Sequence, residues 1–189
     1  MKRLYLLWLL LTPLLFVGCS DTQDEESAST TQGWHFQGRD CLACHNYDLG
    51  ADKKLLVAGT LFKSSSVTDV NDLNESCGGE FIINFLDSSY AKQISSRDYE
   101  DINSDGYKGK GNIFMLSKML DTLNGNYFIQ IVDKDTNNTL ALSLNHSFNT
   151  SEYNISNPVN YGNRLSCNAC HNGDTVSYIY AQSNQDICE

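Results

Sequence analysis

The sequence predicts a mainly β protein, a small antiparallel β-sandwich, and three observations lead to this fold class. Several short runs rich in β-branched and aromatic residues occur after residue 34. Gly, Asn and Asp residues, which favour turns, separate these runs. In addition, no stretch carries the apolar periodicity of a long helix. Residues 34–189 are long enough for one domain with one core.

Six runs are expected to form the strands, because each is apolar and ends at polar or turn-forming residues. They are 55–62, 80–86, 112–120, 127–132, 139–144 and 177–181. The third run is ambiguous, since its end could form a helical turn instead. Turns are expected at 87–89 and 124–126, and the polar loop 133–138 predicts a hairpin between the strands on either side of it.

The first 33 residues have the pattern of an export signal followed by a tether. Lys2 and Arg3 precede an apolar run that is too short for a comfortable membrane span. The run ends at Cys19, in a pattern that resembles a bacterial lipobox, where the cysteine is lipidated and becomes the mature N-terminus. We therefore expect a lipoprotein signal peptide over 1–18 and a flexible polar tether over 19–33. The alternative is ordinary signal cleavage nearby, with Cys19 incidental.

Two copies of the pattern C-x-x-C-H flank the β-rich region. They are Cys41-Leu42-Ala43-Cys44-His45 and Cys167-Asn168-Ala169-Cys170-His171. This pattern is the attachment signature of a c-type haem, because two thiols reach the vinyl groups on one porphyrin edge and the histidine binds the iron. Two complete copies predict two covalently bound haem c groups. The four cysteines would anchor them, and the two motif histidines would be the proximal iron ligands.

Two further histidines, His35 and His146, match in number the second axial positions of two haems. Haem iron that only transfers electrons carries two axial ligands, and a second imidazole closes the site. We therefore expect His35 and His146 to be the distal ligands, either each at the nearer motif or crossed between motifs. Methionine is the competing ligand type, but Met115 and Met119 lie in an apolar run where core packing is expected.

The remaining cysteines and the charge add two expectations. Cys77 and Cys188 are left over, and in an oxidising compartment two spare cysteines predict a disulfide, with two free thiols as the alternative. The chain has 13 basic and 23 acidic residues and a formal net charge of −10. A surplus of negative charge argues against nucleic acid as a partner.

A weaker motif lies between the expected strands 80–86 and 112–120. Asp101, Asn103 and Asp105, with a glycine after the last, match the first half of an EF-hand-type calcium loop. The twelfth loop position is Asn112 rather than the usual bidentate glutamate. A calcium site and a polar surface turn are therefore both open, and the turn is favoured.

Several segments together resemble a known family. They are His35, the first C-x-x-C-H, Ala-Gly-Thr at 58–60, Gly-Asn-Ile at 111–113 and the second C-x-x-C-H. This arrangement resembles a module of exported multihaem cytochromes of metal-reducing bacteria. The resemblance implies an Ig-like β-domain between two haem-binding segments, and electron transfer at or beyond the outer membrane to other cytochromes or an extracellular acceptor.

The expected function is therefore electron transfer by a dihaem lipoprotein of the cell envelope, at the outer membrane and held to it by the lipid alone. One alternative is a dihaem peroxidase or reductase, which needs an open position on one iron. The other is a haem-free β-sandwich lipoprotein that binds other molecules and whose C-x-x-C-H motifs hold disulfides or zinc.

Overall fold

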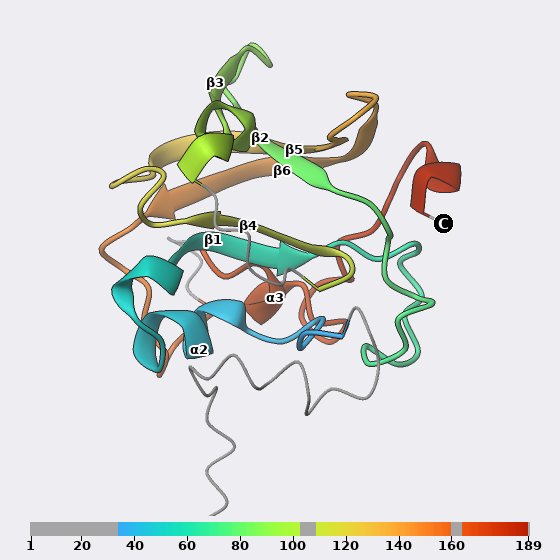
Figure 1. The fold of residues 1–189 in the computed structure, drawn as a ribbon, viewed down its shortest axis with the longest axis horizontal. Helices are drawn as coiled ribbons and strands as arrows, with labels where there is room; N and C mark the ends of the chain where they lie inside the picture. Colours follow the sequence, from blue (N-terminus) through green and yellow to red (C-terminus); the bar gives the residue numbers. More distant parts are fainter. Residues whose placement is uncertain (1–33, 103–108, 160–163, 189) are drawn as a thin grey trace, which may run out of the picture.

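The structure, a computed structural model, describes residues 34–102, 109–159 and 164–188 (Figure 1). The expected signal peptide, the tether with Cys19, and Asn103 and Asp105 of the calcium motif lie outside the described residues; of Asp101 only the backbone is described. The described part is mainly β, as predicted, with two antiparallel sheets.

Strands β1 and β4 form the smaller sheet, and the larger sheet has the order β3-β2-β5-β6. The strands are β1 (Leu55–Thr60), β2 (Phe81–Leu86), β3 (Lys92–Ser95), β4 (Asn112–Leu116), β5 (Asn124–Asp133) and β6 (Thr139–Asn149). The helices are α2 (Cys41–Tyr47) and α3 (Cys167–Cys170), with 3₁₀ turns η1 (Ala51–Lys53), η2 (Ser96–Ile102) and η3 (Gln185–Cys188). The long hairpin β5–β6 closes through the predicted loop 133–138, where the Asn137 amide donates to the Asp133 carbonyl.

Strand β1 lies at the centre of the molecule, and all six of its residues are buried. The larger sheet lies on one side of β1, and the two short helices α2 and α3 lie on the other (Figure 1). Side chains from both sheets, among them Val57, Phe85, Met115 and Ile131, form one hydrophobic core. A strand covered on both sides is a rigid platform, so whatever the two helices carry is held against the core of the domain.

Three details differ from the sequence prediction. Residues 124–126 belong to strand β5 rather than to a turn, because they pair with 147–149 of β6. Gly125 has a φ of +125° there, which glycine adopts easily. Residues 177–181 do not form a strand, and only Tyr180 makes an isolated bridge, to Phe62. The exposed edge strand β3 was not predicted. The ambiguous run 112–120 is a strand as far as Leu116 and then turns.

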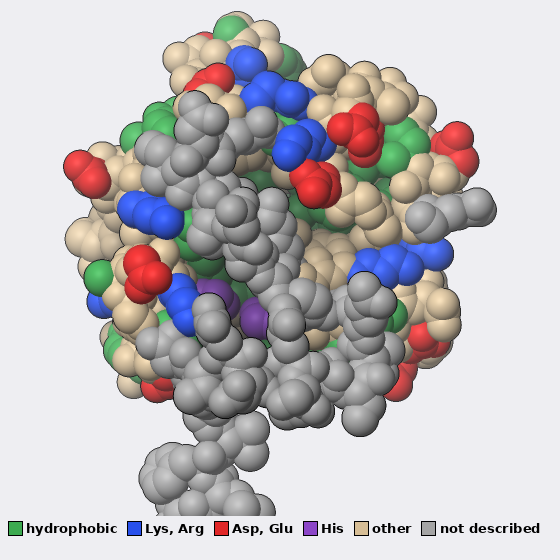
Figure 2. Space-filling model, in the orientation of Figure 1, with side chains coloured by type: hydrophobic (Ala, Val, Ile, Leu, Met, Phe, Trp, Pro, Cys, Tyr) green, Lys and Arg blue, Asp and Glu red, His purple; other side chains and the backbone are tan. Residues whose placement is uncertain are grey.

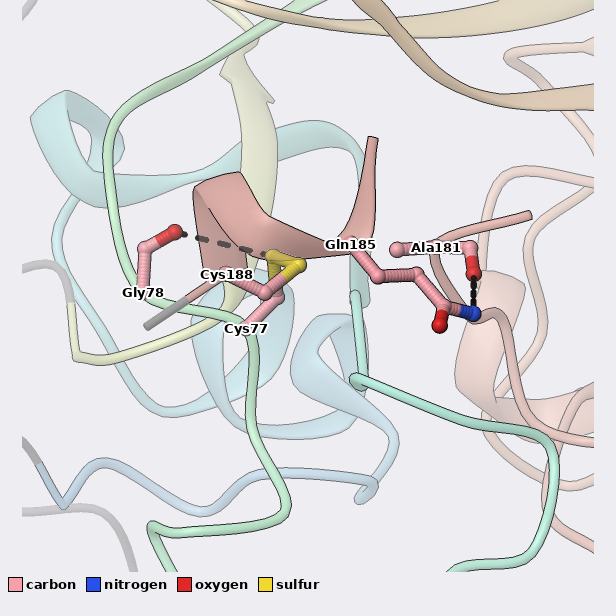
Figure 3. Close-up of a disulfide and its surroundings, with 5 residues drawn as sticks. All are labelled: Cys77, Gly78, Ala181, Gln185 and Cys188. Carbon is pink, nitrogen blue, oxygen red and sulfur yellow. Dashed lines mark hydrogen bonds between the residues drawn. A yellow bond between two sulfur atoms is a disulfide. The ribbon is translucent and has the colours of Figure 1, made fainter. Parts of the chain in front are cut away.

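A disulfide joins Cys77 to Cys188, as the cysteine count predicted (Figure 3). The backbone reinforces the junction, because the Gly78 amide donates to the Cys188 carbonyl at 3.0 Å. Next to it, the Gln185 side chain donates to the Ala181 carbonyl at 2.8 Å and fixes the 3₁₀ turn η3. The C-terminal segment is thereby held against the middle of the chain. Within the described residues, no helix has the length and apolar character needed to cross a bilayer.

Candidate functional site

Helix α2 carries the first C-x-x-C-H motif and is fixed at two points. Leu42 is fully buried in the core. Asn46 makes a two-point contact with the start of β1, donating to the Leu55 carbonyl at 3.0 Å and accepting from the Leu55 amide at 2.8 Å. His45 is oriented by its own bond, since its Nδ1 donates to the Lys53 carbonyl at 2.8 Å. The other ring nitrogen of His45, Nε2, is thus left as the one able to bind a metal.

The imidazole of His35 lies opposite His45. Their ring centroids are 6.0 Å apart and the ring planes are inclined by 63°. The backbone of His35 is held on both sides, because its amide donates to the side chain of buried Gln37 at 3.0 Å and its carbonyl accepts from Asn112 at 2.9 Å. The count of histidines alone predicted His35 as a distal ligand, and the structure has it beside the nearer motif.

Helix α3 carries the second motif and docks directly on β1. The Ala58 amide donates to the Leu165 carbonyl at 3.1 Å, so the segment before the motif pairs with the strand. Gly59 permits the close approach, because a Cβ at this position would lie 2.7 Å from the Cβ of Cys167. His171 is oriented like His45, with its Nδ1 donating to the Ser177 carbonyl at 2.8 Å.

His146 faces His171 with ring centroids 6.3 Å apart and ring planes inclined by 30°. It lies within strand β6, opposite Tyr127 of β5, and not after the strand as the sequence suggested. Its Nδ1 donates to the Leu144 carbonyl at 2.7 Å. Burial lowers the pKa of His146, with smaller contributions from His171 and Arg164, so the neutral imidazole, the form that binds metals, is favoured.

An apolar cavity of about 550 Å³ contains the second pair of histidines. Cys167 and Cys170 of the motif line it together with His146 and His171. Its other walls are mainly aliphatic and aromatic and come from both sheets and from 176–180. The volume is within the range of cofactor pockets, which is about 300–1,000 Å³. Because the motif thiols and both imidazoles meet in one cavity, the second site has the components that a c-type haem requires.

The spacing of the histidines can be compared with that of two axial ligands. With a metal–nitrogen bond of about 2.0 Å and roughly 1.1 Å more from each nitrogen to its ring centroid, two imidazoles on opposite sides of one iron have centroids about 6.2 Å apart. The two observed separations of 6.0 and 6.3 Å match this value. Moreover, Nδ1 of His45, His146 and His171 donates to a backbone carbonyl, the usual partner of a metal-bound histidine. The residues of both sites fit the group that the motifs imply.

Cys41, Cys167 and Cys170 of the two motifs are free thiols. Burial raises the pKa of both Cys41 and Cys167 to about 12, which keeps these two thiols protonated. Among the described residues, no three His, Cys, Asp or Glu side chains converge as metal ligands.

A buried hydrogen-bond network joins the two motifs through Thr60 of β1. The Thr60 hydroxyl donates to Asn112 at 2.9 Å and accepts from the Gly38 amide and from Asn168, both at 3.0 Å. Asn168, the second residue of the second motif, also donates to the Arg39 carbonyl at 2.8 Å, just before the first motif. All three hydrogen-bonding positions of the hydroxyl are used. Two segments far apart in sequence are therefore locked to one strand.

Sequence reasoning did not identify Thr60, Asn112 and Asn168 as site residues, although all three lie in the segments that carry the family resemblance. For Thr60 a signal existed, because it is a polar residue inside the apolar run 55–62 and a buried hydroxyl needs hydrogen-bond partners. Asn112 and Asn168 carry no such signal. On the face drawn in Figure 2, acidic and basic side chains are interspersed, and histidine side chains reach the surface.

Comparison of the chain with protein-family models, curated proteins and solved structures yields no match.

Proposed function

We propose that this chain is a dihaem c-type cytochrome that carries electrons and performs no bond chemistry. One observation carries the proposal: each motif histidine faces a second histidine at the separation of two axial ligands, 6.0 Å at the first site and 6.3 Å at the second. The resemblance of the motif arrangement to exported multihaem cytochromes supports the same conclusion.

The residues of each site have separate roles in this proposal. Cys167 and Cys170 would hold the second haem covalently, and His171 and His146 would hold its iron. At the first site Cys41 and Cys44 would serve as anchors, and His45 and His35 would supply the ligands. Ligation within each site is part of the proposal, and the nearness of His35 to His45 and of His146 to His171 supports it. Bound haem supplies one-electron oxidation and reduction.

The backbone tunes each site through the histidine rings. The carbonyls of Lys53, Leu144 and Ser177 accept from Nδ1 of His45, His146 and His171, and such bonds make the opposite nitrogen a stronger donor to a metal. Strong imidazole donors on both sides favour the oxidised state and a low potential. The second imidazole at each site also favours electron transfer over the peroxidase alternative, which needs an open position.

The proposal includes the finer fold and the location of the protein. The two sheets would form an Ig-like sandwich flanked by haem-binding segments, and the chain would be an envelope lipoprotein at the outer membrane, held by lipid at Cys19. Its partners would be other cytochromes or an extracellular acceptor. The net charge of −10 fits a docking surface for a basic partner or a metal cation.

A visible spectrum of the exported protein tests the proposal. We expect two low-spin haems per chain by pyridine haemochrome, with spectra unchanged by carbon monoxide. The double variant Cys167→Ala, Cys170→Ala should retain one haem per chain. The matched control Cys77→Ala, Cys188→Ala removes two other cysteines and should retain both haems. A colourless exported protein would overturn the proposal, and carbon monoxide binding at one haem would favour the enzyme instead.

A further inference from the structure

Asp40 lies at the junction of the two candidate sites. It immediately precedes the first cysteine of the first motif, and Ser166 immediately precedes the first cysteine of the second. The Ser166 hydroxyl donates to one carboxylate oxygen of Asp40, and the Tyr153 hydroxyl donates to the other at 2.9 Å. The two partners of this half-buried carboxylate are thus 126 and 113 residues away in the chain.

The first cysteines of the two motifs are close neighbours at this junction. The side-chain amide of Asn168, next to Cys167 in sequence, is 3.8 Å from the Cys41 sulfur. The same amide donates to the Arg39 carbonyl at 2.8 Å, on the other side of Asp40. Covalent attachment at Cys41 and at Cys167 would therefore take place on both sides of one carboxylate.

The charge of Asp40 acts on both cysteines. Burial is the largest cause that raises the pKa of the Cys41 and Cys167 thiols, and the carboxylate of Asp40 raises both further. The Asp40 carboxylate repels a negative charge at Cys41 and at Cys167. By the same electrostatics it attracts a positive charge placed near either cysteine. The oxidised iron carries one positive charge more than the reduced iron.

We propose that Asp40 is a positioning residue shared by both sites, whose carboxylate links the two motifs and whose charge lowers the reduction potential of both haems together. The inference rests on the proposed function. It goes beyond that function because Asp40, which precedes the first motif in sequence, would also control the reduction potential at the second site. The Tyr153 hydroxyl moderates this effect, since a donated hydrogen bond partly neutralises the carboxylate.

Spectroelectrochemical titration of the haem-loaded protein tests the inference. Asp40→Asn removes the charge with little change of shape and should raise both midpoint potentials. Tyr153→Phe leaves the charge but removes one hydrogen bond, and it should lower both. The control Asp48→Asn removes an exposed charge at the end of the same helix, where solvent and salt screen it, and its shifts should be much smaller.

The outcomes separate this inference from the proposed function. A chain without haem contradicts the function itself, and the potentials are then not measured. Two haems per chain with only one potential raised by Asp40→Asn, or with neither raised, would overturn the shared role of Asp40. Equal shifts of both potentials in Asp40→Asn and Asp48→Asn would overturn it as well. Should Asp40→Asn not fold, the joint downward shift in Tyr153→Phe decides, and a shift at one haem alone rejects the inference.

Discussion

Replacing Thr60 by valine tests the network that joins the two motifs. The Thr60 side chain is fully buried, and its hydroxyl bonds to Asn112, to the Gly38 amide and to Asn168 over 2.9–3.0 Å. Valine has nearly the same shape, so the substitution keeps the packing and removes all three hydrogen bonds. The measured loss of stability then reports the hydrogen bonds rather than a cavity.

The expected loss follows from these three contacts. A hydrogen bond contributes about 1 kcal/mol net, and a buried partner left unpaired costs about 1–3 kcal/mol. Part of this cost is avoided, because the Asn168 amide keeps its bond to the Arg39 carbonyl. We expect the free energy of unfolding to fall by about 3–5 kcal/mol, which is a large share of the roughly 5–15 kcal/mol of a typical domain.

Urea unfolding followed by circular dichroism measures this loss. With a denaturant dependence of about 2 kcal/mol per molar, the midpoint should fall by roughly 2 M. The matched control Thr175→Val changes an exposed threonine and should alter stability by no more than about 0.5 kcal/mol. A loss below about 1 kcal/mol in Thr60→Val would refute the reasoning, because the network would then not contribute to the junction of the motifs.

Three further predictions concern other parts of the chain. His146→Ala leaves the second site with one axial imidazole, so half of the haem should become high-spin and bind carbon monoxide; an unchanged spectrum would exclude His146 as a ligand. Hydrogen bonds from the Thr136 hydroxyl and amide hold the pKa of Asp133 below its ordinary value of 3.8. The ionised carboxylate therefore stabilises the fold fully above pH 3.8, and this stabilisation is lost as the pH falls through the lowered pKa. Asp133→Asn should therefore cost about 1–2 kcal/mol at neutral pH and nothing below both pKa values, as measured by unfolding across the acid range. Loss of the Cys77–Cys188 disulfide, which joins positions 111 residues apart, should lower stability by about 3–5 kcal/mol, and equal thermal melts of the double alanine variant and the parent would contradict this.

Elements with a buried apolar pattern could be predicted from the sequence. The predicted runs 55–62, 80–86, 127–132 and 139–144 contain β1, β2 and the centre of the β5–β6 hairpin, and the disulfide followed from counting cysteines. Strand β3 was missed because three of its four residues are not buried, so its sequence carries no apolar signal. Residues 177–181 have a strand-like composition but find no strand edge beyond the single bridge of Tyr180.

For the candidate site, the sequence predicted the residue types but not which residues lie together. The number of histidines predicted two pairs, but the partner of each could not be derived from spacing. The pairing depends on the β5–β6 register, which places His146 opposite Tyr127, and on the close docking of α3 at Gly59. Asp40 and Thr60 carry no motif of their own, and their importance follows from hydrogen-bond partners that are distant in the sequence. Contacts of this kind are fixed by tertiary structure and leave no local pattern.

The cavity of the second site is bordered by exposed apolar side chains, which the proposed haem would cover. Leu144 is 82% exposed, and Leu142 and Val176, which line the same cavity, are 38% and 40% exposed. Apolar side chains grouped around a cavity indicate a surface that another molecule covers. Covering Leu144 alone would contribute about 1.5–3 kcal/mol, so haem should stabilise the domain as well as supply its chemistry. Accordingly, the single-haem variant with Cys167→Ala and Cys170→Ala should unfold at a lower temperature than the two-haem protein, and equal unfolding temperatures would show that the haem is not seated in this cavity.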